Sequence, residues 1–501
     1  MKSFISGTNS HIIHVFNNIF YSNVSIIIFT LHFKFDKSIS MKKFNNSYLF
    51  AISMVSAMGG LLFGYDWVVI GGAKPFYERF FDITTSANLQ AWAMSCALIG
   101  CIVGAVVSGV ISDKFGRKWP LLLSAFLFTV ASLGTGLASS YVVFVVFRII
   151  GGVGIGLASA LSPMYIAEVA PSHLRGRFVS LNQMTLVIGI LAAQIINLII
   201  AEKVPLGATD EFIRASWNGQ MGWRWMFFAC TVPSVAFFIL AFTLPESPRW
   251  LMKAGKQDKA FPTLRKIGGD VYAHEEMANI QATLNDVSEK IDFKTLFNPK
   301  FRLVLMIGIV AAVFQQWCGI NTVFNYAEEI FKAAGYGVSD TLFNIVITGT
   351  VNLVFTLIAM FTVDKWGRKK LMIFGSSGLA ITYILLGSAF YFQLKGIAVL
   401  SLVVIAIAIY AMSLAPVVWV ILSEIFPNRV RGAAMALATF ALWIACFILT
   451  YTFPLLNKSF GAAGTFWVYA GICILGFLFV LRKLPETKGK TLEEIEKELV
   501  K

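Results

Sequence analysis

Long apolar runs, separated by short polar stretches, follow one another along most of this chain. A helix needs about 20 predominantly apolar residues to cross the hydrocarbon core of a bilayer, so each run predicts one transmembrane helix. We expect an all-α membrane protein with twelve of these helices in two sets of six. The predicted spans are 48–72, 88–111, 120–138, 141–163, 178–201 and 225–244 in the first set, and 303–332, 341–363, 371–392, 397–422, 433–455 and 465–482 in the second.

The longest polar stretch, from about 245 to 300, separates the two sets and contains helix-forming runs such as 275–290. Short amphipathic helices are therefore expected between the sets. The predicted domains are an N-terminal extension outside the fold (1–44), a first six-helix bundle (45–244), a helical linker (245–300), a second six-helix bundle (301–484) and a tail (485–501).

Residues 1–40 lack the clean apolar core and small-residue cleavage site of a signal peptide, because asparagine and serine interrupt their apolar runs. Met41, followed by two lysines just before the first span, has the pattern of a more natural start. We therefore interpret 1–40 as an upstream extension. A peripheral amphipathic segment is the alternative interpretation.

Basic residues in the loops predict the orientation, because cytoplasmic loops carry an excess of lysine and arginine. Counted from residue 41, 29 of these residues lie on the side that holds both termini, and eight lie on the opposite side. This asymmetry predicts a multi-pass protein of the cell membrane with both termini and the central linker in the cytoplasm.

The composition excludes several classes of protein. Hydrophobic residues make up 57% of the 501 residues and charged residues 14%, whereas soluble domains carry about 25% charged residues. The net charge of +14 does not predict nucleic-acid binding, because the basic residues form short groups between apolar runs. The six cysteines and five histidines show no metal-ligand spacing, and no paired catalytic constellation is present. We expect no enzyme activity, no cofactor and no metal.

Gly152-Val-Gly-Ile-Gly156 has part of the spacing of a nucleotide-binding loop. It lies inside an apolar span with no preceding strand, so close helix packing is the better interpretation. A pump driven by ATP is excluded because the chain has no nucleotide domain.

Three charged motifs each occur twice, in the same order, at offsets of 251, 256 and 240 residues. This internal repeat predicts two homologous six-helix halves. The pairs are Asp113–Lys118 (DKFGRK) with Asp364–Lys369 (DKWGRK), Glu168–Gly176 (EVAPSHLRG) with Glu424–Gly432 (EIFPNRVRG), and Pro245–Arg249 (PESPR) with Pro485–Gly489 (PETKG).

The repeated charges can form a cytoplasmic latch that must break when the inside opens. A spacing of seven places an acid and an arginine around one helix end, where they can pair with the Gly-Arg-Lys loops of neighbouring helices. Ordinary topology charges are the alternative interpretation, and the duplication favours the latch. Its predicted members are Asp113, Arg117, Glu168, Arg175, Asp364, Arg368, Glu424 and Arg431.

From about residue 45 to 495, these motifs resemble the sugar porter family of the major facilitator superfamily, which includes bacterial proton–xylose symporters and glucose facilitators. The resemblance implies the major facilitator fold and alternating-access transport of a monosaccharide, functional as a monomer in the lipid bilayer. Sugar:proton symport is the leading hypothesis, and uncoupled facilitation is the alternative. A non-transporting sugar sensor is disfavoured, because such sensors need a long tail and only about 20 residues follow the last span.

Two ionisable residues lie within predicted spans, Asp66 and Arg148. A charge at the centre of a membrane helix costs about 3 kcal/mol on insertion scales, so it is usually paired and functional. A wet Asp66 near the helix end is the alternative. The resemblance implies that Asp66 is the protonatable acid of the symporters and that Arg148 is its cationic partner.

Amide side chains within the spans suit a sugar, because each both donates and accepts hydrogen bonds without a charge. Gly319 permits local unwinding between them, and tryptophans at mid-span can cover the apolar face of a sugar ring. The resemblance implies that the cavity positions are Phe63, Gln183, Gln315, Gln316, Asn321, Asn352, Trp419 and Trp443.

The predicted cavity departs from the family pattern at three points. Asn325-Tyr326 stands where the family has two tyrosines, and we include Asn325 among the candidate sugar-binding residues. Ile190 and Leu442 each replace a glutamine of the xylose symporters. Pentose, hexose and cyclitol substrates therefore all remain open.

Overall fold

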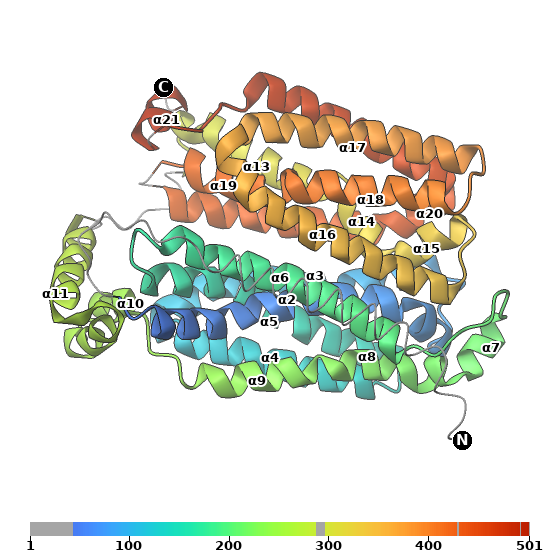
Figure 1. The fold of residues 1–501 in the computed structure, drawn as a ribbon, viewed down its shortest axis with the longest axis horizontal. Helices are drawn as coiled ribbons and strands as arrows, with labels where there is room; N and C mark the ends of the chain where they lie inside the picture. Colours follow the sequence, from blue (N-terminus) through green and yellow to red (C-terminus); the bar gives the residue numbers. More distant parts are fainter. Residues whose placement is uncertain (1–43, 287–295, 428–429, 491, 500–501) are drawn as a thin grey trace. The chain divides into compact units, whose positions relative to one another are not determined.

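The computed structural model describes residues 44–286, 296–427, 430–490 and 492–499. The predictions for residues 1–43 lie outside the described residues. Within Asn45–Lys501, Figure 1 shows long helices running side by side, with α10 and α11 at one end. The helices of the first half are α2 (Asn46–Phe80), α3 (Ala87–Phe115), α4 (Lys118–Leu137), α5 (Tyr141–Val169), α6 (Arg175–Ile200), α7 (Asp210–Ala215), α8 (Trp223–Ala229) and α9 (Thr231–Ala241).

The helices that follow are α10 (Pro248–Lys253) and α11 (Gln257–Asp286), which lie in the polar stretch, and then those of the second half. The second half comprises α13 (Arg302–Trp317), α14 (Ile320–Asn325), α15 (Ala327–Ala333), α16 (Val338–Trp366), α17 (Arg368–Tyr391), α18 (Ile397–Met412), α19 (Leu414–Ile425), α20 (Arg431–Lys483) and α21 (Leu492–Leu499).

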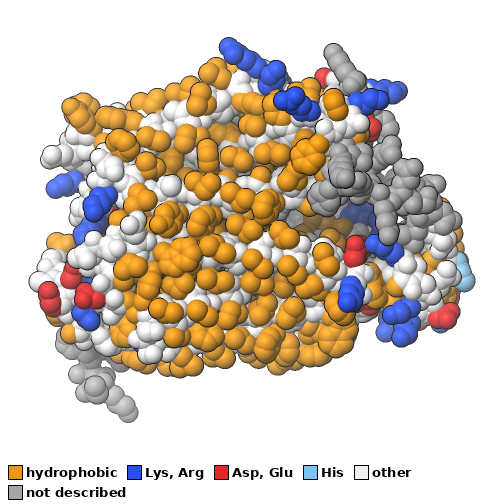
Figure 2. Space-filling model, turned by 180° about the vertical axis from the view of Figure 1, so that it is seen from behind, with side chains coloured by type: hydrophobic (Ala, Val, Ile, Leu, Met, Phe, Trp, Pro, Cys, Tyr) orange, Lys and Arg blue, Asp and Glu red, His pale blue; other side chains and the backbone are white. Residues whose placement is uncertain are grey.

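Eleven helical runs among the described residues are long and apolar enough to cross a membrane. The last of them, α20, has 53 residues and contains two spans, which meet at Gly461, where φ is +67°. The prediction of twelve membrane-spanning helices is therefore confirmed. On the face shown in Figure 2, hydrophobic side chains cover the middle, and charged side chains gather toward the two ends.

Glycines allow the closest helix crossings. A Cβ atom on Gly152 of α5 would lie 1.9 Å from the carbonyl oxygen of Ala97 on α3, and one on Gly100 would lie 2.1 Å from that of Ile149. Only residues without a side chain permit this approach. The glycines of the Gly152–Gly156 motif thus pack α5 against α3, as the apolar context predicted.

Two predicted spans differ from the structure in a way that matters for the site. The run 303–332 is not one helix: it breaks at Gly319, where φ is +87°, and again at Tyr326. The first span does not end at 72, because α2 continues to Phe80 through Pro75. An ion pair between Lys74 and Glu78, one turn apart, supports this extension.

Candidate functional site

Asp66 of α2 and Arg148 of α5 form a buried ion pair. The Arg148 Nη1 donates to Asp66 Oδ1 at 2.8 Å, and the guanidinium lies over the ring of Phe227 at 5.6 Å. Asp66 is 6% exposed and Arg148 is 3% exposed, so Asp66 is not the solvated residue of the alternative interpretation. Neither Asp66 Oδ2 nor Arg148 Nε has a hydrogen-bond partner among the described residues. A buried charge that loses its partner is strongly destabilised. Protonation of Asp66 would therefore leave the charge of Arg148 buried without its counter-charge.

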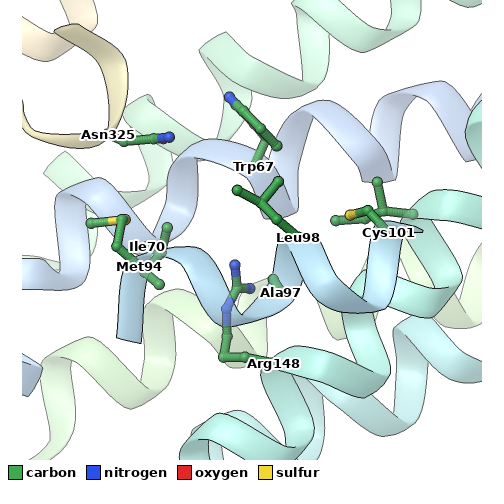
Figure 3. Close-up of a pocket in the computed structure, with 9 residues that line it drawn as sticks. Trp67, Ile70, Met94, Ala97, Leu98, Cys101, Arg148 and Asn325 are labelled. Carbon is green, nitrogen blue, oxygen red and sulfur yellow. The ribbon is translucent and has the colours of Figure 1, made fainter. Parts of the chain in front are cut away.

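A small cavity lies beside this pair and reaches the second half of the molecule. Its lining includes Arg148, Trp67 and Asn325, and Figure 3 shows the Arg148 side chain extending toward the space between the other two. The cavity volume is about 10 Å³, which is close to the smallest space that holds one water molecule. Arg148 of the ion pair and Asn325, a candidate sugar-binding residue, therefore line one cavity.

Three amide side chains meet where the first part of the broken helix ends. Gln315 Nε2 donates to the carbonyl oxygens of Leu414 and Ala415 at 3.1 and 3.0 Å, which joins α13 to α19. Gln316 donates to Gln315 Oε1, and Asn321 in turn donates to Gln316 Oε1. The left-handed Gly319 lies between Gln316 and Asn321, where it interrupts the helix after α13 and precedes α14. The structure thus brings three of the predicted residues into one hydrogen-bonded group.

Three aromatic rings join the two halves beside the ion pair. The ring of Phe63 lies 5.8 Å from that of Trp443 and 6.0 Å from that of Trp67, and the two tryptophans are 6.2 Å apart. Sequence reasoning missed Trp67, although its position next to Asp66 and one turn beyond Phe63 could have indicated it. Trp443 Nε1 and Asn325 Oδ1 are buried and lack a hydrogen-bond partner among the described residues. Each is therefore available to a polar ligand.

Among the described residues, no hydrogen bond, ion pair or ring contact joins three of the predicted cavity residues to these groups. Gln183 is half-buried on α6, and Asn352 is buried on α16. Trp419 on α19 is 40% exposed. Their assignment to the sugar site stays a prediction.

The two halves carry matching ion pairs, in which an arginine at the start of α4 or α17 meets a glutamate near the end of α5 or α19. Arg117 binds Glu168 with two hydrogen bonds of 2.8 and 2.9 Å, and Arg368 binds Glu424 with two of 3.2 and 2.8 Å. A two-pronged arginine–carboxylate pair is a strong and directional contact. Each pair lies within one half of the molecule.

Sequence reasoning missed two glutamates that complete these sites. Glu246 accepts from the backbone N–H of Arg117 at 2.7 Å, and Glu486 accepts from that of Arg368 at 2.9 Å. The preceding residues, Gly116 and Gly367, have φ of +88° and +90°, and a Cβ on either would lie within 2.6 Å of its glutamate. The recurrence of Pro-Glu in both halves was the available signal.

The remaining latch candidates are placed differently. Asp113 lies 3.1 Å from Lys253 Nζ and 3.9 Å from Arg117, and Arg431 Nε donates to the carbonyl oxygen of Phe426. Arg175 is exposed at the start of α6. Among the described residues, Glu168 binds Arg117. The side chain of Asp364 lies outside the described residues.

Comparisons with known proteins agree with this architecture. The family model described as "Sugar (and other) transporter" matches residues 52–499. The D-xylose-proton symporter of Escherichia coli (strain K12) is 41% identical over 484 residues, covering 91% of this chain and 96% of that protein. The arabinose-proton symporter of Bacillus subtilis (strain 168) is 42% identical over 455 residues, with the same two coverages.

Solved structures of a sugar transporter are also similar to this chain. The inward open conformation of the xylose transporter XylE from E. coli is similar with a TM-score of 0.78 and 39% identity, covering 90% of this chain and 100% of that chain. The same transporter bound to 6-bromo-6-deoxy-D-glucose gives a TM-score of 0.74 and 40% identity, covering 91% of this chain and 100% of that chain.

Proposed function

This chain belongs to the family of sugar (and other) transporters, and from that premise we propose that it couples the import of a monosaccharide to the entry of a proton. The buried pair of Asp66 and Arg148 carries the proposal. When Asp66 is charged, Arg148 holds it, and when Asp66 is protonated, Arg148 is released. Because one cavity adjoins Arg148 and Asn325, proton binding and sugar binding can bias the same movement.

We propose that the sugar binds between the amide group of Gln315, Gln316 and Asn321 and the aromatic group of Phe63, Trp67 and Trp443. The amides match sugar hydroxyls in both directions, and the unpartnered Trp443 Nε1 and Asn325 Oδ1 supply a further donor and acceptor. Relatives named for D-xylose and arabinose support a pentose as the first substrate to test.

Orientation and assembly follow from the same reasoning. We propose that both termini and the helices α10 and α11 are cytoplasmic, that the membrane is the cell membrane, and that the monomer is the transporting unit. The excess of lysine and arginine on the side of the termini supports this orientation. The proposed bundles are residues 45–244 and 301–484.

The proposal is tested in proteoliposomes that contain the purified full chain. Labelled D-xylose, L-arabinose and D-glucose are offered with and without an imposed proton gradient. We expect concentrative uptake of at least one pentose only when the gradient is present. Equilibration without accumulation in both conditions would establish an uncoupled facilitator instead. Sugar binding without any flux would indicate a sensor.

The proposed latch is tested by removing its arginines. We expect Arg117→Ala and Arg368→Ala each to lower the maximal uptake rate at least about tenfold, because both pairs are partly buried and two-pronged, and such charge pairs are costly to break. Sugar affinity, measured by tryptophan fluorescence, should stay within about threefold, since neither arginine contacts the proposed sugar site.

A matched control for these variants is Arg265→Ala, which removes an exposed ion pair with Asp270. Exposed pairs contribute little, so uptake should not change. If sugar affinity falls in step with the uptake rate in Arg117→Ala, the latch assignment is wrong.

A further inference from the structure

Charged residues that the loop count had placed outside the membrane helices are buried between the two halves. Lys74 of α2 is 2% exposed, and its Nζ lies 3.0 Å from Glu78 Oε1 on the same helix. Across the interface, Lys74 pairs with Glu329 and lies 3.6 Å from Glu328 Oε2, both on α15. This lysine therefore joins the first half of the molecule to the second.

A second cation extends the contact. Arg79 Nε binds Asp210 Oδ1 of α7 at 2.7 Å, and its Nη1 lies 3.5 Å from Glu328 Oε1. We call the two cations and their four carboxylate partners the inter-bundle charge cluster: Lys74, Glu78, Arg79, Asp210, Glu328 and Glu329. Figure 1 shows α7 and α15 at the end opposite to α10 and α11. In the proposed orientation, this is the outer end.

The cluster is continuous with the proposed sugar site. Glu328 and Glu329 follow the chain break at Tyr326, whose ring lies 5.9 Å from Lys74 Nζ. One turn before Lys74, a Cβ on Gly71 would lie 3.3 Å from the carbonyl oxygen of Asn325. The same short helices thus carry Asn321 and Asn325 toward the sugar and the glutamates toward Lys74.

Tyr326, at the break between α14 and α15, is held in place by contacts with α20. Its hydroxyl donates to the carbonyl oxygen of Thr450 at 2.7 Å, and its ring stacks on Phe453 with centroids 4.5 Å apart. A movement of α14 caused by a sugar therefore reaches α15 directly, because the two helices meet at this residue. Opening the outer end must separate Lys74 from Glu329 and expose both charges to water. While the halves stay packed, the two charges remain paired.

We propose that Lys74 is a positioning residue of the transport cycle, which holds the outer end closed through Glu329 and Glu328 and opens it when α14 and α15 move. The proposal rests on the transport cycle set out above. Lys74 does not contact the sugar in this view; it sets how often the sugar site faces outward.

Two variants separate the bridging role from a role in folding. Glu329→Gln removes one of the two α15 carboxylates that face Lys74 and leaves Lys74 with Glu78 of α2 and with Glu328 of α15. Lys74→Met removes every contact of the ammonium group. Lys203→Met, an exposed lysine near the same end, is the matched control. If Lys74→Met does not fold, Glu329→Gln alone decides the question.

The opening is measured as a distance between spin labels on the full chain. Cysteines introduced at Thr85 and Ala333, both exposed and in different halves, are labelled selectively because the six native cysteines are buried. We expect the ratio of the longer-distance population to the shorter one to rise at least about tenfold in both variants without any sugar. Lys203→Met should match the unmodified chain.

Transport provides the second readout. The maximal pentose uptake rate should fall at least about fivefold, with KM within about threefold, because closing at the outer end becomes slow. Unchanged distance distributions in Glu329→Gln would overturn the proposal, even if protein yield fell. If the unmodified chain moves no sugar but the distances shift as expected, the proposed function fails and the role of Lys74 stands.

Discussion

Asp66→Asn is expected to abolish accumulation of sugar against a gradient while preserving exchange of labelled for unlabelled sugar. An asparagine cannot take up the coupling proton, so the cycle loses its driving force. A membrane potential of 100 mV contributes about 2.3 kcal/mol per charge moved, which corresponds to roughly 50-fold accumulation at one proton per sugar. That factor should fall to one.

The variant loses the counter-charge of Arg148 and is therefore less stable, but it should still fold, because asparagine keeps the shape of the side chain and an acceptor for Arg148 Nη1. Arg148 also retains its place over the ring of Phe227 and its contact of 3.5 Å with the carbonyl oxygen of Asp66. Exchange needs only the movement of the loaded carrier, so it is expected to survive.

Accumulation and exchange are both measured in proteoliposomes, together with sugar-induced proton uptake. Asp82→Asn is the matched control, because Asp82 is exposed and its backbone φ of +57° suits asparagine as well. Sugar-induced proton uptake of normal size in Asp66→Asn would remove Asp66 from the coupling step and point to another acid.

Gly152→Ala is expected to destabilise the first bundle severely. The added methyl group would overlap the carbonyl oxygen of Ala97, which is backbone and cannot rotate away. Forcing α3 and α5 apart costs about 1–3 kcal/mol in a well-packed core, and it also disturbs Arg148, which lies one turn before Gly152 on α5. The melting temperature in detergent and the yield of folded protein should both fall.

Gly109→Ala on α3 is the control for this substitution, because a Cβ there meets nothing within 4 Å. Alanine is a better helix former than glycine, so the melting temperature should be unchanged or slightly higher. Equal melting temperatures for the two variants would contradict the close packing of α3 against α5.

Much of the fold could be predicted from the sequence because a bilayer restricts a chain to long apolar helices. The duplicated motifs then indicated two halves, and the charge in the middle of a span singled out Asp66 and Arg148. The break at Gly319 was also predictable, since a glycine between two amides permits the left-handed conformation that the structure adopts.

The inter-bundle charge cluster could not be predicted in the same way. Hydropathy ended the first span at residue 72, because Lys74, Glu78 and Arg79 resemble loop charges when no partner is visible. The partners of Lys74 and Arg79 across the interface, Glu328 and Glu329, lie some 250 residues further along the chain. Only the packing of α15 against α2 brings them together, so the sequence around each residue does not indicate the contact.

The paired sites of Gly116 with Glu246 and of Gly367 with Glu486 have a consequence for natural variation. Because both halves use the same left-handed glycine and the same glutamate acceptor, a deleterious substitution in one half has an equivalent in the other. A complete map of tolerated substitutions should therefore show the same sensitive positions twice. It should lose this symmetry around Lys74 and Glu329, where each half contributes a different charge to a single contact.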